Sequence, residues 1–440
     1  MTSTIDRPGR APRSVGAADG GARSRVADVG GAAQPGLSSS LASLARRFDS
    51  PVTSYYLIVG TTTALLLIGL VMVLSASMVT SYKDDGSSYA VFLNQARFAG
   101  IGLVGAVIAA RLSVAWWKRL AIPSLGVAVL LQALVFVPGL GLSKGGNRNW
   151  LKLTSTLSLQ PSELTKIGLV LVGALILANK RALLGRVSHA IVPYLVPVAA
   201  VTIGLVLVGH DLGTALVLIA IVGAVMYAAG VPGRLFVAAV GAAAVLAAVL
   251  VLTSANRMDR ITNWLSGSCN DPNGECGQAV HGLYALADGG WWGVGLGASK
   301  EKWSWLPEAH NDFIFAIIGE ELGLPGTFII LALFAVIATA CYRIVSRSTD
   351  QFVRIAAAGA MAWILGQAMI NIGAVIGLLP VIGVPLPLVS AGGSALVTTL
   401  LAMGMLVSFA RTEPGAAEIL AARPGVIKRS LAVLPRRRQR

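Results

Sequence analysis

Ten apolar runs, each long enough to cross the hydrocarbon of a bilayer as a helix, recur along the chain. Backbone polar groups cannot be left unpaired in hydrocarbon, so runs of this length are expected to form helices. The sequence therefore predicts an all-α polytopic membrane protein with about ten transmembrane helices. The runs are centred on residues 55–77, 95–111, 120–138, 163–179, 191–208, 212–230, 234–254, 314–342, 355–379 and 393–410.

The composition excludes a chain of soluble domains. Hydrophobic residues make up 55% of the chain, charged residues make up only 12%, and the mean hydropathy is +0.73. A soluble fold cannot hide so much apolar surface behind so few charges. The formal net charge of +15 raises the question of a nucleic-acid partner. No basic stripe interleaved with aromatic residues accompanies that charge, so no nucleic-acid partner is expected.

The distribution of Lys and Arg predicts the topology. With both termini in the cytoplasm, 25 of the 35 Lys and Arg residues fall on the cytoplasmic side, and the bias repeats from loop to loop. Cytoplasmic loops of membrane proteins carry this excess of cations. The basic charge is thus a signal of orientation, and it suits contact with anionic lipid of the inner leaflet.

Three parts follow one another along the chain. Residues 1–50, rich in Gly, Ala, Ser and Arg, are expected to form a disordered cytoplasmic tail. Residues 51–411 form the ten-span domain, and residues 412–440 form a basic cytoplasmic tail. The large outer loop between spans seven and eight, residues 255–311, holds five of the nine Trp residues. These form either an interfacial belt or a lid over a cavity at membrane level.

Polar residues beside the apolar runs are the candidates for chemistry, because a charge near hydrocarbon is costly unless it is paired or functional. The first group opens the fourth span with Gln160 and Pro161, followed by Glu163 and Lys166. A proline suits the first turn of a helix, and an acid and a base three residues apart can form an ion pair. The group is either a stable helix start or part of a site.

Two further groups lie at predicted outer turns. Upstream of the fourth span, Arg148 and Lys152 place two cations at the outer surface, where they suit an anionic head group. Asp211 lies in a tight turn between spans five and six. It is either a helix cap or a site residue.

The eighth span is preceded by a cluster of titratable residues that ends at His310 and Asp312. The stretch from Asp312 to Tyr342 is too long for one upright helix, and the segment 323–326 (Gly-Leu-Pro-Gly) can break it. Asp312 is therefore predicted on a short segment that dips into the membrane. Partly dry surroundings raise the pKa of a carboxyl group toward neutral, which suits a general base. A buried structural ion pair is the alternative.

The segment 385–394 carries two prolines and two glycines, Gly392 and Gly393, and cannot continue a helix. Irregular backbone at membrane depth is tolerated only where it is buried in protein or lines a cavity. A glycine-rich segment, residues 293–300, resembles a phosphate loop but lacks its spacing and its preceding strand. It is interpreted as a flexible turn.

Cys269 and Cys276 flank a turn-rich stretch on the predicted oxidising side, which favours a small disulfide-closed loop. No Cys or His cluster has the spacing of zinc ligands. The sequence therefore indicates no metal site and no cofactor, and it leaves the need for a divalent cation open.

At these places the sequence resembles the SEDS family of bacterial cell-wall polymerases (shape, elongation, division and sporulation). Each matching motif is weak alone, but the five in this order, over residues 55–411, are specific. The division branch is the better match and the elongation branch the second. The motifs are Gln160–Glu163, Asp211–Ala215, Gly289–Gly290 with Gly293–Gly297, Leu306–Ala316, and Asn371–Gly373 continuing through Gly377–Pro380 to Ser394.

The resemblance implies a peptidoglycan glycosyltransferase that polymerises lipid II, the undecaprenyl-diphosphate-linked disaccharide pentapeptide. The reaction is expected at the outer face of the cytoplasmic membrane, at the division septum. Asp312 matches the family's essential aspartate, the expected base for the acceptor hydroxyl. The donor sugar is α-linked and the product β-1,4-linked, so one inverting displacement fits. The substrate-binding residues expected are Arg148, Lys152, Glu163, Lys166, Asp211, His310 and Ser390, and the structural ones are Gln160, Pro161, Glu320, Gly392 and Gly393.

The resemblance also implies partners. A class B penicillin-binding protein, a single-span transpeptidase, is expected to dock on spans eight and nine and an outer loop, together with other division proteins. Two alternative functions remain open on the residues themselves. A lipid II flippase is favoured only by Glu320 and Glu321, which lie deeper than the other polar groups. A non-catalytic division scaffold would act through its tails.

Overall fold

A computed structural model describes residues 50–144, 147–152, 154, 158–183, 191–252, 258, 261–262, 264, 275–303 and 305–422. All of the described residues lie in one compact unit, Asp49–Arg440. Residues 1–49 of the predicted disordered tail and the last eighteen residues of the predicted basic tail lie outside the described part.

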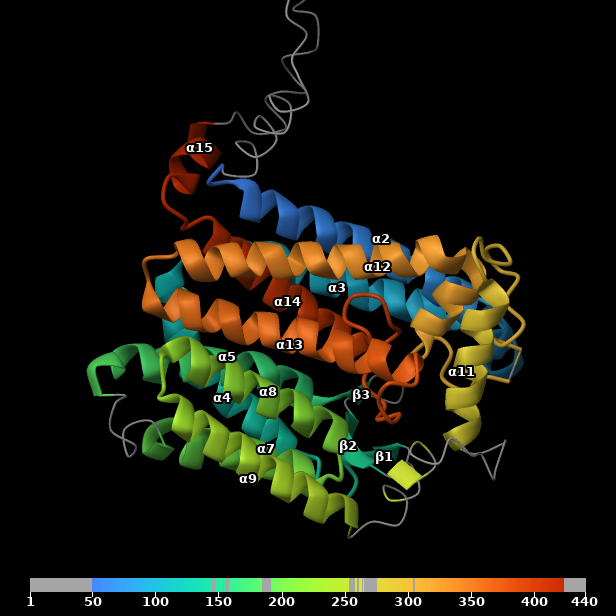
Figure 1. The fold of residues 1–440 in the computed structure, drawn as a ribbon, viewed down its shortest axis with the longest axis horizontal. Coiled ribbons are helices and arrows are strands. Elements are labelled where there is room, and N and C mark those ends of the chain that lie inside the picture. Colours follow the sequence, from blue (N-terminus) through green and yellow to red (C-terminus); the bar gives the residue numbers. More distant parts are fainter. Residues whose placement is uncertain are drawn as a thin grey trace, which may run out of the picture. The chain divides into compact units, whose positions relative to one another are not determined.

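Helices dominate the described residues (Figure 1). The α-helices are α2 (Thr53–Asp85), α3 (Ala90–Arg111), α4 (Val114–Leu134), α5 (Pro161–Asn179), α7 (Val201–Val208), α8 (Leu212–Ala229), α9 (Gly233–Leu252), α11 (Glu275–Gly289), α12 (Ile314–Arg347), α13 (Gln351–Val375), α14 (Gly393–Ala410) and α15 (Ala416–Ala422). The remaining elements are the 3-10 helix η1 (Arg181–Leu183), the π-helix η2 (Ile191–Ala200), and the strands β1 (Gly141–Lys144), β2 (Asn147–Lys152) and β3 (Ser158–Leu159).

A helical segment lies at each of the ten predicted positions, which confirms the helical membrane fold. Among the described residues, eight helices are long and apolar enough to cross a membrane: α2, α3, α4, α5, α8, α12, α13 and α14. The predicted fifth span is built from η2 and α7, and its apolar stretch, Val192–Val208, is shorter. The predicted seventh span corresponds to α9. The number of segments that cross the bilayer stays a prediction.

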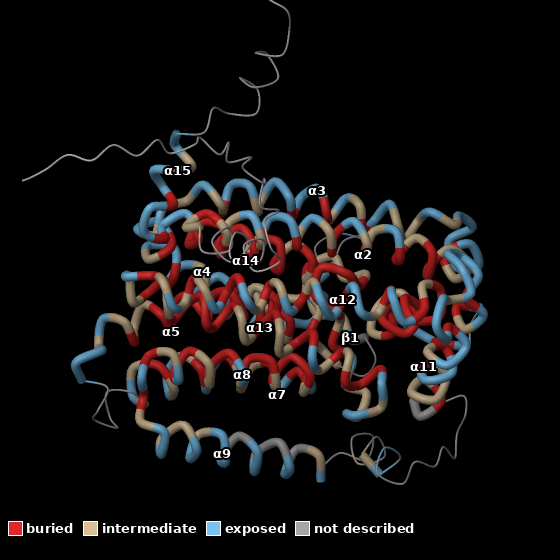
Figure 2. The backbone as a smooth tube through the Cα atoms, turned by 45° about the horizontal axis from the view of Figure 1, so that its top comes forward, coloured by how far each residue is buried: buried red, intermediate tan, exposed pale blue. Residues whose placement is uncertain are grey.

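Burial separates central helices from peripheral ones. In α5 and α14, 78% of the most apolar window is buried, against 17% in α3 and α4. The helix α13 packs on α5, α8 and α12, so it connects α5 and α8 to α12 (Figure 1). Figure 2 shows buried residues along α5 and α14 and mainly exposed ones along α3. Exposed apolar faces of this kind suit contact with lipid.

One end of the bundle gathers the cations that the sequence assigns to the cytoplasm. Lys118 Nζ, at the start of α4, lies 2.7 Å from an oxygen of Asp350, the residue before α13. Near the end of α12, Arg343 donates to Ser54 Oγ at 3.2 Å. Arg411, just after α14, donates to Ala110 O at 2.8 Å. Consecutive helices therefore run antiparallel, as the predicted topology requires.

The opposite end holds two features that the hydropathy pattern does not reveal. The loop before α5 folds into a small antiparallel sheet in the order β1-β2-β3, with Leu142 paired to Trp150 and Leu151 to Leu159. The predicted loop 255–311 contains α11, which packs against α12. Short paired elements satisfy backbone groups that a long structureless loop would leave open.

The predicted break in α12 is confirmed. Gly323 has φ 65° and ψ −159°, a conformation that strongly favours glycine, and Pro325 follows it. The break leaves a buried segment, residues 313–321, directly after Asp312. The glycine-rich segment near residue 295 is more fixed than expected of a flexible turn, because the main-chain N–H of Val294 donates to Glu320 O at 2.9 Å.

The described part leaves the predicted disulfide untested. Cys269 lies outside it, and of Cys276 only the main chain, in α11, is described. The third cysteine, Cys341, is a buried free thiol in α12. The predicted basic tail is described as far as residue 422 and contains the short helix α15.

Candidate active site

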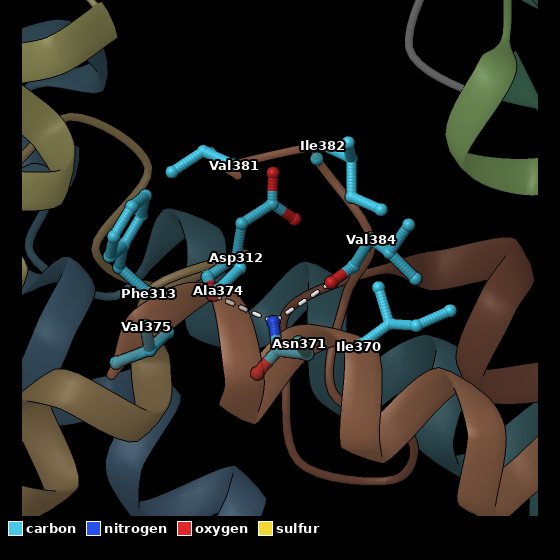
Figure 3. Close-up of a pocket in the computed structure, with 10 residues that line it drawn as sticks. Asp312, Phe313, Ile370, Asn371, Ala374, Val375, Val381, Ile382 and Val384 are labelled. Atoms are coloured by element: carbon cyan, nitrogen blue, oxygen red, sulfur yellow. Dashed lines mark hydrogen bonds between the residues drawn. The ribbon is translucent and has the colours of Figure 1, made fainter. Parts of the chain in front are cut away.

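Asp312 lies at the mouth of a small pocket between the start of α12, the end of α13 and the segment 381–384. Figure 3 shows its carboxylate pointing toward Val381 and Ile382 and away from Asn371. A Cβ built on Gly383 would lie 3.4 Å from Asp312 Oδ2, so that glycine, at φ +67°, lets the backbone approach the carboxylate. Most of the other lining side chains are apolar, and Asp312 is partly buried.

The main chain on both sides of this pocket is held by Asn371 of α13. Its side-chain amide donates to Asp312 O at 2.7 Å and to Val384 O at 2.8 Å (Figure 3). One turn earlier on α13, Gln367 Nε2 donates to Pro385 O at 2.9 Å. Residues four apart share one helix face. This face therefore fixes the irregular segment opposite Asp312.

Ser390 ties the same segment to the chain just before Asp312. Its hydroxyl donates to Asn311 O at 2.7 Å and accepts from the main-chain N–H of Leu386 at 2.7 Å. The next N–H, of Ala391, donates to His310 O at 2.9 Å. Gln95 of α3 closes the network, donating to Ser390 O at 3.0 Å and accepting from Gly392 N at 3.2 Å. Of the two settings expected for irregular backbone, burial in protein or the lining of a cavity, residues 386–390 are found in the first.

Gly393 is needed where α14 begins, because a Cβ there would clash with the ring of Phe98 on α3. The Gly392 N–H already donates to α3 through Gln95. Gly393 thus has a packing reason to be a glycine, whereas a Cβ on Gly392 would make only an ordinary contact with Ala395.

Asp211 is the N-cap of α8. Its Oδ1 accepts from Thr214 N at 2.9 Å, and its Oδ2 accepts from the Thr214 hydroxyl at 2.8 Å. Oδ2 also accepts from the side-chain amides of Asn149 at 2.7 Å and Gln160 at 3.1 Å. The buried carboxylate therefore joins β2, α5 and α8. Four hydrogen bonds are strong grounds for a structural role, whereas contact with substrate stays a prediction.

The turn at Asp211 packs against the wall of the Asp312 pocket. A Cβ on Gly213 would lie 2.7 Å from Ile382 O, in the wall of that pocket. On the other side, Arg148 N donates to Gly209 O at 3.0 Å. Backbone contacts thus lead from Arg148 through the 209–213 turn to the segment opposite Asp312.

The predicted cations differ in how far they are engaged. The Arg148 guanidinium donates to Val135 O at 3.1 Å and Phe136 O at 3.2 Å, just after α4. Lys166 is buried, and its Nζ lies 2.7 Å from Glu163 Oε1 and 2.9 Å from Gln367 Oε1. Lys152 is exposed at the end of β2. The predicted Glu163–Lys166 pair is present, and Gln367 connects it to the segment 385–390.

Glu320 and Glu321 hold the outer loop to α12. Glu320 accepts from Ser299 Oγ at 2.6 Å and from Lys300 N at 2.6 Å. Glu321 accepts from Ser75 Oγ at 2.7 Å, and Lys302 Nζ lies 2.9 Å from it. The four side chains of Glu320, Glu321, Ser299 and Lys302 are all buried. The predicted structural role of Glu320 fits these contacts, and the Lys302 pair was not expected.

His310 lies in the loop before α12, two residues from Asp312. Burial lowers the pKa of its imidazole below the usual 6.5, while the nearby Glu308 carboxylate opposes the shift by raising it. Glu308 has φ +56° and accepts a hydrogen bond from the Asn311 side-chain amide. The neutral imidazole is therefore the favoured form near neutral pH.

The structure brings most of the predicted residues to one end of the bundle, in one connected network. Those in the network or next to it are Asp312, His310, Ser390, Gly392, Gly393, Asp211, Gln160, Pro161, Arg148, Glu163 and Lys166. Glu320 belongs instead to the α12–loop contact. Sequence reasoning missed Gln95, Asn149 and Gln367, whose signal was an amide side chain within or beside an apolar run. Among the described residues, no group of three His, Cys, Asp or Glu side chains could hold a metal ion.

Comparison with known proteins adds independent findings. The family model described as "Cell cycle protein", FTSW_RODA_SPOVE, matches residues 55–414. The probable peptidoglycan glycosyltransferase FtsW of Mycobacterium tuberculosis is 42% identical over 372 residues, which are 84% of this chain and 70% of that protein. Stage V sporulation protein E of Bacillus subtilis is 36% identical over 358 residues, 81% of this chain and 96% of that protein.

Two solved structures resemble the fold. One is a chain from the structure titled "Structural coordination of polymerization and crosslinking by a peptidoglycan synthase complex", with a TM-score of 0.65 and 26% identity over 80% of this chain and 96% of that chain. The other is the rod shape determining protein RodA of Thermus thermophilus. Its TM-score is 0.60 with 26% identity, over 81% of this chain and 97% of RodA.

Proposed function

The chain belongs to the FTSW_RODA_SPOVE family of cell cycle proteins, and from this premise we propose how its site works as a peptidoglycan glycosyltransferase of the FtsW type. The substrate we propose is lipid II. The product is a β-1,4-linked glycan strand, formed at the outer face of the cytoplasmic membrane. The protein is a multi-pass membrane protein, and its place at the division septum is part of the proposal.

One observation carries the assignment of the base: the Asp312 carboxylate faces a pocket with mostly apolar walls, on a main chain held by Asn371 and Ser390. A fixed carboxylate in partly dry surroundings can accept the proton of the attacking acceptor hydroxyl. The hydroxyl oxygen then attacks the anomeric carbon of the donor sugar, and the bond to the diphosphate breaks. A single displacement inverts the α-linkage to β without a covalent enzyme intermediate.

The diphosphate that leaves carries charge that needs cations nearby. Arg148 and Lys152 lie on β2, which the turn at Asp211 connects to the wall of the Asp312 pocket. Lys152 is the more exposed of the two, so we propose it as the first contact for the diphosphate. Lys166 is engaged with Glu163 and Gln367, so we propose that it acts by fixing the segment at Pro385.

The test is polymerisation of lipid II by purified full-length protein in liposomes. Asp312→Asn keeps the side-chain size and removes the base, so glycan synthesis should fall by roughly 10²–10⁴-fold. The matched control is Asp350→Asn, which changes a carboxylate at the opposite end of the bundle. Equal polymer from Asp312→Asn and the unchanged protein would disprove the role of Asp312.

A transpeptidase partner is the second part of the proposal. One structural neighbour comes from a peptidoglycan synthase complex whose title names polymerization and crosslinking. We propose that this chain pairs with a class B penicillin-binding protein and acts with other division proteins. Co-purification with that transpeptidase, and a higher polymerisation rate in its presence, is the expected result.

The flippase alternative rested on Glu320 and Glu321. Both carboxylates are engaged with the outer loop, through Ser299 and Lys302, and do not line a described pocket. No observation on the described residues favours transport over polymerisation. Transfer of fluorescent lipid II across liposomes by this protein alone would reverse that preference.

A further inference from the structure

A groove lies at the end of the bundle opposite the Asp312 pocket. Its walls come from the turn between α3 and α4, the end of α14, and the short helix α15. Ser390 and Gly392 precede α14, whereas Ser408 and Arg411 lie at its other end. An α-helix of eighteen residues is about 27 Å long, so the groove is separate from the candidate active site. The side chains that matter for its chemistry are Arg111, Leu112, Ser113, Arg411, Thr412 and Leu420.

The groove carries two cations and no carboxylate among its lining residues. Arg411 donates to Ala110 O at 2.8 Å, through one of its five N–H groups. Arg111 makes no ion pair within the part of the chain that the structure describes. The nearby Lys118, by contrast, is paired with Asp350. Two guanidinium groups that share a groove without a described counter-ion favour an anion from outside the chain.

The rest of the lining suits an amphiphile better than a small soluble anion. Leu112 and Leu420 supply apolar contact, and Ser113 and Thr412 supply hydroxyl groups beside the arginines. The groove lies where α3 and α14 end, and α3 exposes apolar side chains such as Val104, Val107 and Ile108 along its length. A molecule with acyl chains along α3 and a charged head at the helix ends would use both surfaces.

The charge of the surrounding sequence also favours an anionic lipid. The predicted topology places this end in the cytoplasm, and the sequence after α15 carries only basic charged residues: Arg423, Lys428, Arg429, Arg436, Arg437, Arg438 and Arg440. Anionic lipids of the inner leaflet attract basic segments next to a span, by about 1 kcal/mol per Lys or Arg. The groove would add a fixed site to this diffuse attraction.

We propose that the groove between α3, α14 and α15 binds the phosphate head group of an anionic phospholipid of the inner leaflet, with Arg111 and Arg411 as its ligands. The bound lipid would join α15 to the ends of α3 and α14. This is a site distinct from the one for lipid II, and it does not depend on the assignment of Asp312.

The test uses full-length protein in an uncharged detergent and short-chain phosphatidylglycerol as the probe. The midpoint of thermal unfolding is followed against lipid concentration, with short-chain phosphatidylcholine and inorganic phosphate as separate arms. Phosphatidylglycerol should raise the midpoint, and the other two should not at the same concentrations. The double variant Arg111→Gln/Arg411→Gln should weaken the lipid's half-saturation by roughly thirty-fold.

The matched control is Arg119→Gln/Arg181→Gln, which removes the same charge from exposed positions outside the groove and should leave half-saturation unchanged. Arg111→Gln alone leaves the Arg411–Ala110 hydrogen bond in place and should weaken binding by roughly five-fold. Equal binding by the double variant and the unchanged protein would overturn the proposal. So would equal effects of the two lipids, an equal effect of free phosphate, or no effect of phosphatidylglycerol.

Discussion

The side-chain amide of Asn371 donates to the main-chain carbonyl of Asp312 at 2.7 Å, and the same nitrogen donates to Val384 O at 2.8 Å. The main chain of the candidate base and the wall of its pocket are thus held by one residue, and the Asp312 carboxylate points away from it (Figure 3). We infer that Asn371 is a positioning residue, because its amide holds the main chain of Asp312.

Replacing Asn371 by Leu should lower kcat for lipid II polymerisation by roughly 10–100-fold, since a displacement of about 1 Å at a reacting group has an effect of this size. KM should change less, because the predicted cations are untouched. The control is Gln132→Leu. Gln132 is also a buried amide, on α4, but neither of its side-chain polar atoms has a hydrogen-bond partner among the described residues. Equal kcat values for the two variants would contradict the positioning role.

Gly69 of α2 should not tolerate a methyl group. A Cβ there would lie 2.7 Å from Leu388 O and 2.7 Å from Val389 Cα, and neither backbone atom can move aside alone. Gly69→Ala should therefore destabilise the protein by about 1–3 kcal/mol and reduce polymerisation through the 385–390 segment. Gly60, on the same helix, has nothing within 4 Å of a built Cβ. Gly60→Ala should be neutral or stabilising, and thermal unfolding of both variants in detergent checks the pair.

The buried pair of Lys302 and Glu321 gives a prediction about stability. Lys302→Met leaves the Glu321 carboxylate buried with Ser75 as its remaining side-chain partner, which should cost about 3–5 kcal/mol. The double variant Lys302→Met/Glu321→Gln should recover part of this loss, because no unpaired charge remains. The measurement is the midpoint of thermal unfolding of the single and the double variant. A double variant that is less stable than the single variant would contradict the predicted recovery.

His310 should make stability depend on pH. Because burial lowers its pKa below 6.5, the unfolded chain binds a proton more readily than the folded one in the window below 6.5. The contribution of the neutral imidazole to the free energy of unfolding is therefore present above pH 6.5. It is lost as the pH falls from 6.5 toward the lowered pKa of His310 in the folded protein. The drop in unfolding midpoint between pH 7.5 and pH 5.5 should be smaller in His310→Gln. An identical drop in both proteins would count against a buried neutral imidazole.

The local sequence was sufficient to predict much of the fold and part of the candidate site. The apolar runs predicted the positions of the helices, and the Gly-Leu-Pro-Gly sequence predicted the break at Gly323. The three-residue spacing of Glu163 and Lys166 predicted their ion pair. The five motifs in order predicted the family, which the comparisons confirm. These features depend on neighbours along the chain or on burial in lipid, and a sequence contains both kinds of information.

Only the tertiary structure decided which side chains meet across helices. Gln95 and Ser390 are 295 residues apart, and Ser75 and Glu321 are 246 apart, yet each pair shares a hydrogen bond. The sequence shows that such polar groups sit beside apolar runs and need partners. Their partners depend on which helices pack together, a choice made by the packing of whole faces. For the same reason the sequence by itself determined a helical membrane protein of this family with Asp312 as the expected base, while packing of α13 against the 381–390 segment decided how the main chain of Asp312 is held.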